Sequence, residues 1–248
     1  MLHVCISDRT QRLNGYQPVF GFEFFQIWFY HGELCIPSIP QPNEKIIKEL
    51  DFPVIFHATF NPPDFEKYGQ RLIELLDYFE HNEVIIHAIC ETEPVTNDSV
   101  LYLADNVQKI YDKLHRNGIK IYFENNSVYI DKKGEINKFF NSVEDLRVVF
   151  DANPNIGLLL DVAHVNNYEH LKSIVDMRFP ECIHIADKRT GVLHEHLPLG
   201  SGDMDFDMIF KDLLAGYDGS IILEAIQTWE DIAKSKTIID NLFSNRGV

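Results

Sequence analysis

The chain has 248 residues, 45% of them hydrophobic and 24% charged, and carries a formal net charge of −16. The hydrophobic content is too high for a disordered protein, and no apolar run approaches the roughly 20 residues that a membrane span requires. The negative charge disfavours nucleic acid as a partner without excluding it, because affinity for DNA comes largely from Lys and Arg side chains that neutralise phosphates. A chain of this length can bury one large core, and we expect a single domain over residues 1–248.

Short apolar runs rich in β-branched and aromatic residues recur along the chain and predict eight strands. In chain order they are Leu2–Ile6, Val19–Phe25, Pro53–His57, Val84–Ile89, Ile119–Glu124, Ile156–Asp161, Cys182–Ala186 and Ile221–Ala225. Several of these runs are apolar at almost every position, which is typical of parallel strands that are covered on both faces.

Segments with helical periodicity separate most of these strands. They are Phe65–Glu80, Leu101–Arg116, Val143–Phe150, Tyr168–Met177, Phe206–Leu214 and Trp229–Leu242. The segment His31–Pro42 carries too much proline for a helix, and we expect it to form a loop over the barrel mouth. Strands that alternate with helices, without a Gly/Ser-rich linker, predict an α/β fold: a single (β/α)8 TIM barrel with eight parallel strands.

Nothing in the sequence indicates export or disulfide bonds. The N-terminus (MLHVCISDRT) lacks the basic start and the long apolar stretch of a signal peptide, so we expect a cytoplasmic protein. The cysteines include no CxxC pair, and we interpret them as reduced and structural. They are Cys5, Cys35, Cys90 and Cys182.

Ionisable residues mark the ends of the later predicted strands. Glu124, Asp161 and Glu224 end the fifth, sixth and eighth strands or lie at their ends, and His184 lies in the seventh. In a parallel barrel these ends converge on one mouth, where a buried charge is costly unless it is paired or bound to metal. Mixed imidazole and carboxylate ligands suit Zn²⁺, or Mn²⁺ where oxygen ligands dominate. The pattern therefore predicts a divalent metal site, with Glu124 and Glu224 able to move protons beside it.

Further histidines fall near the same ends and are candidate ligands. They are His57, His87, His164, His194 and His196. Taken singly, each strand-end histidine is more often a hydrogen-bonded core residue, and Asp161 alone could cap the following helix. One shared metal site explains all of these positions together, so we predict that all nine residues are metal ligands.

Other residues are candidates for substrate binding. Lys188 and Arg189 follow the seventh strand and could bind a phosphate or acid group, although a role as ordinary loop charges is equally open. Trp28 is expected past the end of the second strand, where it could form an apolar wall of the pocket; core packing is the alternative.

Five motifs carry a family resemblance: FEN (Phe123–Asn125), LDVAH (Leu160–His164), HIAD (His184–Asp187), HLPLGSGDMDF (His196–Phe206) and ILEAI (Ile222–Ile226). Together they resemble the xylose-isomerase-like TIM-barrel superfamily, which includes sugar isomerases and epimerases and the endonuclease IV group. The resemblance covers essentially the whole chain. Its epimerase branch implies one Mn²⁺-type ion held by Glu124, Asp161, His184 and Glu224, the two glutamates as the acid/base pair, and His164 in contact with substrate.

The nuclease branch implies a different site on the same residues. There the four ligands are joined by His57, His87, His164, His196 and an Asp, and together they hold three zinc ions. Position 194 carries His in place of that Asp, and imidazole cannot bridge or carry charge as a carboxylate does. The resemblance also places Phe60 where that branch inserts an aromatic wedge into DNA.

Two enzyme functions therefore remain. The preferred one is a divalent-metal-dependent isomerase or epimerase of a small sugar or sugar derivative, with a small-molecule carbohydrate as substrate. The alternative is an endonuclease IV-like zinc-dependent phosphodiesterase that acts on abasic-site DNA or another phosphoester. Between one and three ions of Zn²⁺ or Mn²⁺ fit these functions, and assembly into a homo-oligomer is open. A barrel without catalysis is disfavoured by the intact set of four ligands.

Overall fold

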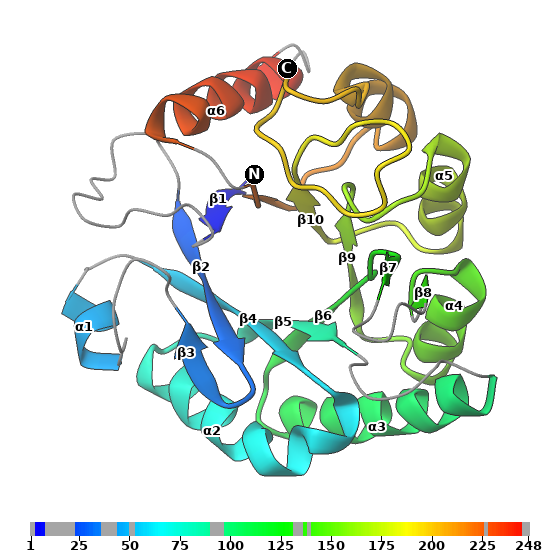
Figure 1. Ribbon diagram of the computed structural model, residues 1–248. Helices are drawn as coiled ribbons and strands as arrows, with labels where there is room; N and C mark the ends of the chain where they lie inside the picture. Colours follow the sequence, from blue (N-terminus) through cyan, green and yellow to red (C-terminus); the bar gives the residue numbers. More distant parts are fainter. Residues whose placement is uncertain are drawn as a thin grey trace.

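The computed structural model describes residues 3–7, 23–35, 44–49, 53–89, 97–130, 136–137, 140–225 and 228–244. In these residues the strands form a ring and the helices surround it on the outside (Figure 1). The strands are β1 (His3–Ser7), β2 (Phe24–Tyr30), β3 (Glu33–Cys35), β4 (Val54–Phe60), β5 (Glu83–Ala88), β6 (Lys120–Glu124), β7 (Tyr129–Ile130), β8 (Ile136–Asn137), β9 (Gly157–Asp161), β10 (Cys182–Ile185) and β11 (Ser220–Leu223).

The sheet has nine strands in the order β1-β11-β10-β9-β6-β5-β4-β2-β3. Strand β1 pairs in parallel with β11 on one side and with β2 on the other, so the sheet closes into a ring, and β3 extends from β2 as an additional strand. The predicted α/β barrel is thus confirmed, but the sheet is not made of eight parallel strands alone, because β3 runs antiparallel to β2. The separate hairpin of β7 and β8 lies outside this sheet.

The antiparallel strand β3 corrects the loop expected over His31–Pro42. His31 and Gly32 take positive φ angles of 47° and 94°, as a tight two-residue hairpin turn requires, and the chain then returns along β2. The loop prediction is wrong for Glu33–Cys35, and residues 36–42 lie outside the described residues. The second strand was also placed too early: β2 begins at Phe24 and continues to Tyr30, so Trp28 lies within the strand. Residues 19–22 of that prediction are outside the described part.

The helices follow the expected alternation. They are α1 (Glu44–Glu49), α2 (Phe65–Tyr78), α3 (Asn97–Arg116), α4 (Val143–Ala152), α5 (Tyr168–Met177) and α6 (Trp229–Ser244), with a short 3₁₀ turn at Pro62–Asp64. Side-chain oxygens of Ser142 and Asn167 accept backbone N–H groups in the first turns of α4 and α5, which fixes where these helices begin. The predicted α-helix Phe206–Leu214 is for most of its length a π-helix, Met208–Leu213. No helix in the described residues is long and apolar enough to cross a membrane.

The two faces of the barrel strands pack in different environments. Residues such as Phe56, Ile86 and Leu158 face outwards and pack against the helices in one large core cluster. The alternate residues face inwards and fill the barrel axis; they are Ile55, Ile85, Tyr122, Leu159, Cys182 and Ile222. Because side chains alternate along a strand, the residue two positions after each of these six also faces the axis. This inner apolar layer therefore lies directly below the side chains of those later residues.

Candidate metal centre

Ionisable side chains occupy the positions directly above the inner apolar layer. They are His57 on β4, His87 on β5, Glu124 on β6, Asp161 on β9, His184 on β10 and Glu224 just after β11. Each lies two residues beyond an inner apolar residue. His57 is the middle residue of β4, and the other five lie at the carboxyl end of their strands or within one residue of it. The structure thus brings these six predicted ligands to one mouth of the barrel, where enzymes of this architecture place their active sites.

Four of them form the inner group, defined as Glu124, Asp161, His184 and Glu224. All four are buried, and each offers a ligand atom within 4.8 Å of the others. His184 Nδ1 lies 2.6 Å from Glu224 Oε2 and 3.2 Å from Glu124 Oε1. The other ring nitrogen, His184 Nε2, donates to Gln26 Oε1 at 2.8 Å, so Nδ1 is the atom left to face the carboxylates.

Glu124 also belongs to a second group, with His57 and His87. Its Oε2 atom lies 2.8 Å from His57 Nε2 and 3.6 Å from His87 Nδ1. Its Oε1 atom faces His184, and also His164 Nδ1 at 3.5 Å. A carboxylate whose two oxygens face two sets of nitrogen ligands is suited to bridge two cations.

The charges of the two groups are set by their neighbours. Burial alone would raise the pKa of Glu124, but the imidazoles of His87, His184 and His57 outweigh it and hold that pKa well below its usual range. Burial lowers the pKa of His184, yet Glu224 and Glu124 raise it well above its usual value. A positive charge is therefore stabilised between these carboxylates, and a divalent ion would supply it in place of the His184 proton.

His87 and Asp161 complete this pattern. Burial lowers the pKa of His87 to about 4, so its ring is neutral at pH 7 and keeps a lone pair for a cation. Burial would raise the pKa of Asp161, but His164 and His196 lower it to about 2, so this side chain is a carboxylate.

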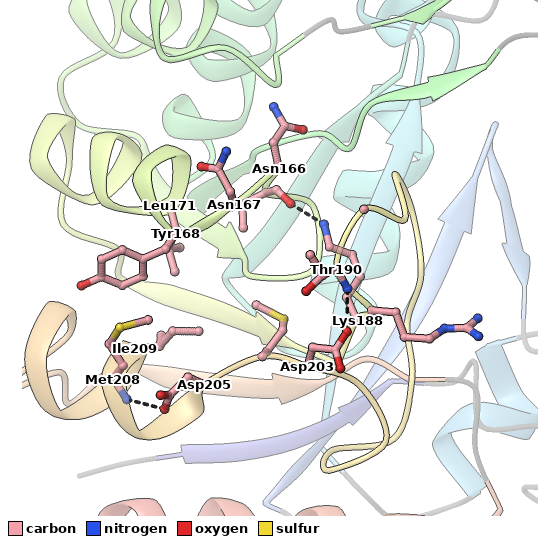
Figure 2. Close-up of a pocket in the computed structure, with 14 residues that line it drawn as sticks. Asn166, Asn167, Tyr168, Leu171, Lys188, Thr190, Asp203, Asp205, Met208 and Ile209 are labelled. Atoms are coloured by element: carbon pink, nitrogen blue, oxygen red, sulfur yellow. Dashed lines mark hydrogen bonds between the residues drawn. The ribbon is translucent and has the colours of Figure 1, made fainter.

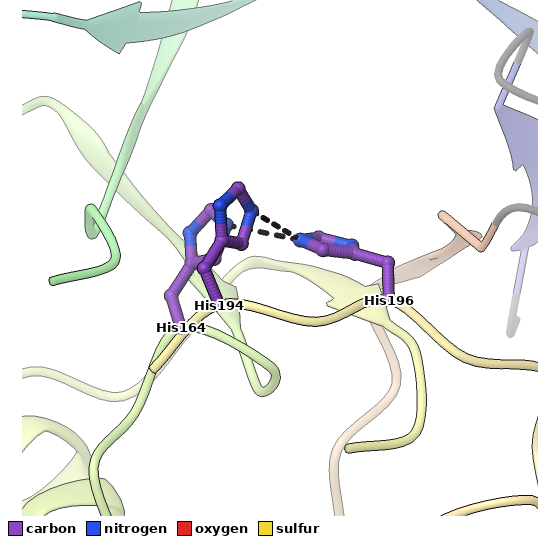
Figure 3. A group of neighbouring side chains, drawn as sticks. All are labelled: His164, His194 and His196. Carbon is purple, nitrogen blue, oxygen red and sulfur yellow. Dashed lines mark hydrogen bonds between the residues drawn. The ribbon is translucent and has the colours of Figure 1, made fainter. Parts of the chain in front are cut away.

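The remaining predicted ligands form the outer group, defined as His164, His194 and His196 (Figure 3). His196 Nε2 lies 3.2 Å from His164 Nε2 and 3.1 Å from His194 Nε2. His164 and His196 are buried, whereas His194 is exposed. Two nitrogens bound at 2.0–2.1 Å to one tetrahedral ion are about 3.3 Å apart, so the outer group has the spacing of a zinc site.

Two residues that the sequence reasoning left without a role support the ligands. Gln26 accepts from His184 Nε2 and so sets the tautomer of His184. In the sequence, Gln26 stands out only as a polar residue within a strand of mostly aromatic residues. Asp187 is buried, and its carboxylate accepts backbone N–H groups from Lys188, Gly200, Gly202 and Met204 at 2.8–3.2 Å. The Asp187 carboxylate thereby holds the returning segment that follows His196.

The predicted substrate residues Lys188 and Arg189 have separate surroundings. Lys188 is buried, and its ammonium group donates to the carbonyl oxygen of Val165. Burial lowers the pKa of Lys188 below its usual value, and Asp161 and Glu195 offset only part of this shift. Arg189 is exposed and forms an ion pair with Glu195. Both line a cavity of about 260 Å³ between the start of α5 and the loops after β10 (Figure 2). Asp203 and Asp205 line the same cavity.

Trp28 and Phe60 lie on different faces of the barrel wall. The Trp28 ring meets the His57 ring edge-on with centroids 5.9 Å apart, so it borders the ligand groups from within β2. Phe60 is three residues after His57 and therefore points the other way, where it is buried against Phe65. The structure does not bring Phe60 to the mouth.

Comparison with known proteins identifies relatives of this architecture. A family model described as xylose isomerase-like TIM barrel matches residues 20–241. A search of curated proteins finds no match. Many solved structures are similar to this chain. A D-tagatose 3-epimerase-like protein is 21% identical, with a TM-score of 0.71, over 98% of this chain and 97% of that one.

The second is an IOLI protein with a bound zinc atom, 17% identical with a TM-score of 0.70, over 99% of each chain. The third is the 3-keto-D-glucoside 4-epimerase YcjR from E. coli, 18% identical with a TM-score of 0.65, over 98% of this chain and 100% of that one. Identities this low show a shared fold.

Proposed function

The chain belongs to the xylose isomerase-like TIM barrel family, and from that premise we propose that it is a divalent-metal-dependent isomerase or epimerase of a small sugar or sugar derivative. One observation carries this proposal: two buried carboxylates, Glu124 and Glu224, lie in one ligand group with His184 between them. The epimerases among the structural neighbours support a small carbohydrate as substrate.

The inner group would hold the ion. When bound, a divalent cation polarises a carbonyl and hydroxyl pair of the substrate and so acidifies the neighbouring C–H. Glu124 is an ionised carboxylate by virtue of the imidazoles around it and is therefore able to accept a proton. Glu224 would enter the reaction protonated and give that proton to the same carbon from another side, so that one glutamate gains a proton as the other loses one. Trp28 at the edge of the group would limit access of water.

The test is exchange of a substrate C–H with solvent. Protein loaded with Mn²⁺ is incubated with a panel of unphosphorylated and phosphorylated ketoses in D₂O, and deuterium incorporation is followed by NMR together with the appearance of the epimer. Glu224→Gln is expected to reduce exchange by about 10²-fold or more. Glu230→Gln, an exposed glutamate of α6, is the matched control. Absence of exchange with every ketose, in protein shown by elemental analysis to contain metal, would contradict the proposal.

A zinc-dependent phosphodiesterase is the second candidate, because Glu124 faces the nitrogens of two ligand groups and the outer group adds a third. Adjacent divalent ions stabilise the attacking and leaving oxygens in phosphoester cleavage. The formal net charge of −16 weighs against DNA as the substrate. Nicking of an abasic-site duplex by catalytic amounts of the zinc-loaded protein, lost in His57→Ala, would favour this candidate over the isomerase.

A further inference from the structure

The cavity beside the start of α5 combines an apolar wall with charged groups of both signs. None of the residues that line it is one of the nine candidate metal ligands. We propose that this cavity is a second binding site, for a small zwitterion with an apolar side chain, of the class of the aliphatic α-amino acids. The inference goes beyond the proposed function, because the ligand of this cavity is not the sugar substrate.

One wall of the cavity is apolar. Leu171 on α5 and Ile209 on the π-helix are buried there, and Met208 beside them is half-buried. A methionine side chain is flexible and adapts to the shape of an apolar ligand. The cavity volume of about 260 Å³ is below the roughly 300–1,000 Å³ of pockets for drug-sized ligands, so the wall suits a short aliphatic group.

A buried ammonium group lies on the other side of the cavity, away from Leu171 and Ile209 (Figure 2). Lys188 is only 7% exposed, and its Nζ atom donates to the carbonyl oxygen of Val165. An ammonium group has three N–H donors, and among the described residues this carbonyl is the one hydrogen-bond partner of Lys188 Nζ. Buried donors without a partner cost free energy, so a carboxylate in the cavity would be stabilised by the donors that remain.

Two carboxylates supply the opposite charge. Asp203 Oδ2 accepts from Thr190 N at 2.9 Å, and Asp205 Oδ1 accepts from Met208 N at 2.9 Å. Both aspartates are exposed, and within the part of the chain that the structure describes the second oxygen of each carboxylate has no hydrogen-bond partner. The backbone thus holds each carboxylate by one oxygen and leaves the other to accept from an ammonium group of a ligand.

Charges of both signs disfavour simpler ligands. A phosphate would be attracted by Lys188 but repelled by Asp203 and Asp205. Arg189 does not offset this repulsion, because it is already paired with Glu195. A simple amine, in turn, would leave the buried donors of Lys188 without an acceptor. An α-amino acid carries a carboxylate and an ammonium group on one carbon, so it satisfies both sides of the cavity while its side chain packs on the apolar wall.

The experiment is isothermal titration calorimetry of the metal-loaded protein with free amino acids. L-leucine and L-methionine are each expected to bind saturably at one site per chain. L-alanine, which lacks most of the apolar side chain, is expected to bind with about tenfold lower affinity or less. Isocaproate and isoamylamine are leucine without its ammonium group and without its carboxylate, and a loss of about tenfold or more is expected for each.

Variants of the lining residues locate the site. Lys188→Met and Asp203→Asn each remove one charge at similar volume, and each should lower the affinity for L-leucine by about tenfold or more. Asp207→Asn, at an exposed aspartate of the same segment that does not line the cavity, is the matched control. Circular dichroism checks that each variant is folded. Asp203 is exposed, so Asp203→Asn keeps the test decisive if the buried change at Lys188 prevents folding.

Three results would overturn the inference. The first is no saturable binding of L-leucine or L-methionine. The second is binding of inorganic phosphate, isocaproate or isoamylamine as tightly as L-leucine. The third is an unchanged affinity for L-leucine in both Lys188→Met and Asp203→Asn, as expected for an amino acid that coordinates the metal instead. No sugar is present in these titrations, so their result is independent of the C–H exchange test.

Discussion

Asn125 forms both hydrogen bonds of its side-chain amide with the backbone of a single residue, Asp161. Asn125 Nδ2 donates to the Asp161 carbonyl oxygen at 3.2 Å, and Asp161 N donates to Asn125 Oδ1 at 2.7 Å. The carbonyl oxygen of Asn125 in turn accepts from His164 Nδ1. One buried residue thus positions a ligand of the inner group and a ligand of the outer group.

Asn125→Ala is expected to weaken metal binding by about 10- to 100-fold, because Asp161 loses the support that fixes its position. It should also lower the free energy of unfolding by about 1–3 kcal/mol, since two buried backbone groups lose their partner. Competition with a metal-binding dye and urea unfolding measure the two effects. Asn117→Ala, at the exposed end of α3, is the control. Unchanged metal affinity in Asn125→Ala would show that Asp161 is held by other contacts.

Gly202→Ala tests the support that Asp187 gives to the segment after His196. A Cβ atom at position 202 would lie 2.4 Å from Asp187 Oδ1 and 2.6 Å from the carbonyl oxygen of Lys188, so the segment must shift. We expect a loss of about 1–3 kcal/mol in stability and weaker zinc binding. Ser201→Ala, an exposed neighbour, should leave both unchanged. Thermal unfolding with and without Zn²⁺ provides the comparison.

Cys35 and Cys182 are expected to differ in reactivity. Burial raises the pKa of the Cys182 thiol to about 12, so almost none of it is thiolate at pH 8. Cys35 is exposed at the end of β3. Peptide mapping after brief treatment with iodoacetamide should find Cys35 modified and Cys182 intact in the folded protein, and both modified in urea. Rapid labelling of Cys182 without denaturant would mean that the barrel interior opens readily.

His81 is expected to make the fold sensitive to acid. Burial lowers its pKa below the usual 6.5, and Glu83 opposes this shift only in part. As the pH falls through 6.5, the unfolded chain takes up the proton before the folded one, so stability is lost. His81→Gln should therefore lose less stability between pH 7 and pH 5 than the wild type. Urea unfolding at both pH values measures this, with His115→Gln as control. An identical loss in all three proteins would exclude a contribution from His81.

Much of the inner group could be predicted because the strands that carry it are strongly apolar and end abruptly in charge. For example, every residue of β9 (GLLLD) is buried, and Asp161 is the last residue of this strand. The outer group was harder to predict, because His194 and His196 reach the mouth from a loop. That loop depends on Asp187, whose four backbone partners are up to 17 residues away in sequence.

The errors have local physical causes. Phe60 was expected at the mouth, but an odd number of residues separates it from His57, so alternation along β4 turns it to the helices. The antiparallel strand β3 was missed because proline in the same segment suggested a loop, whereas the turn at His31 and Gly32 comes before the prolines. The second strand was predicted to end at Phe25, five residues before the end of β2, because aromatic residues extend the apolar run on both sides of Phe24.

The spacing of two residues between the inner apolar layer and the ligands has a consequence for how such a protein can change in evolution. Deleting one residue from β9 upstream of Asp161 would turn that carboxylate towards the helices and bring an apolar side chain to the axis. Deleting two residues would leave the Asp161 side chain facing the barrel axis, but at the level that Leu159 occupies in the inner apolar layer. Length variation in this lineage is therefore expected in the connections between strands, while the barrel strands diverge by substitution alone.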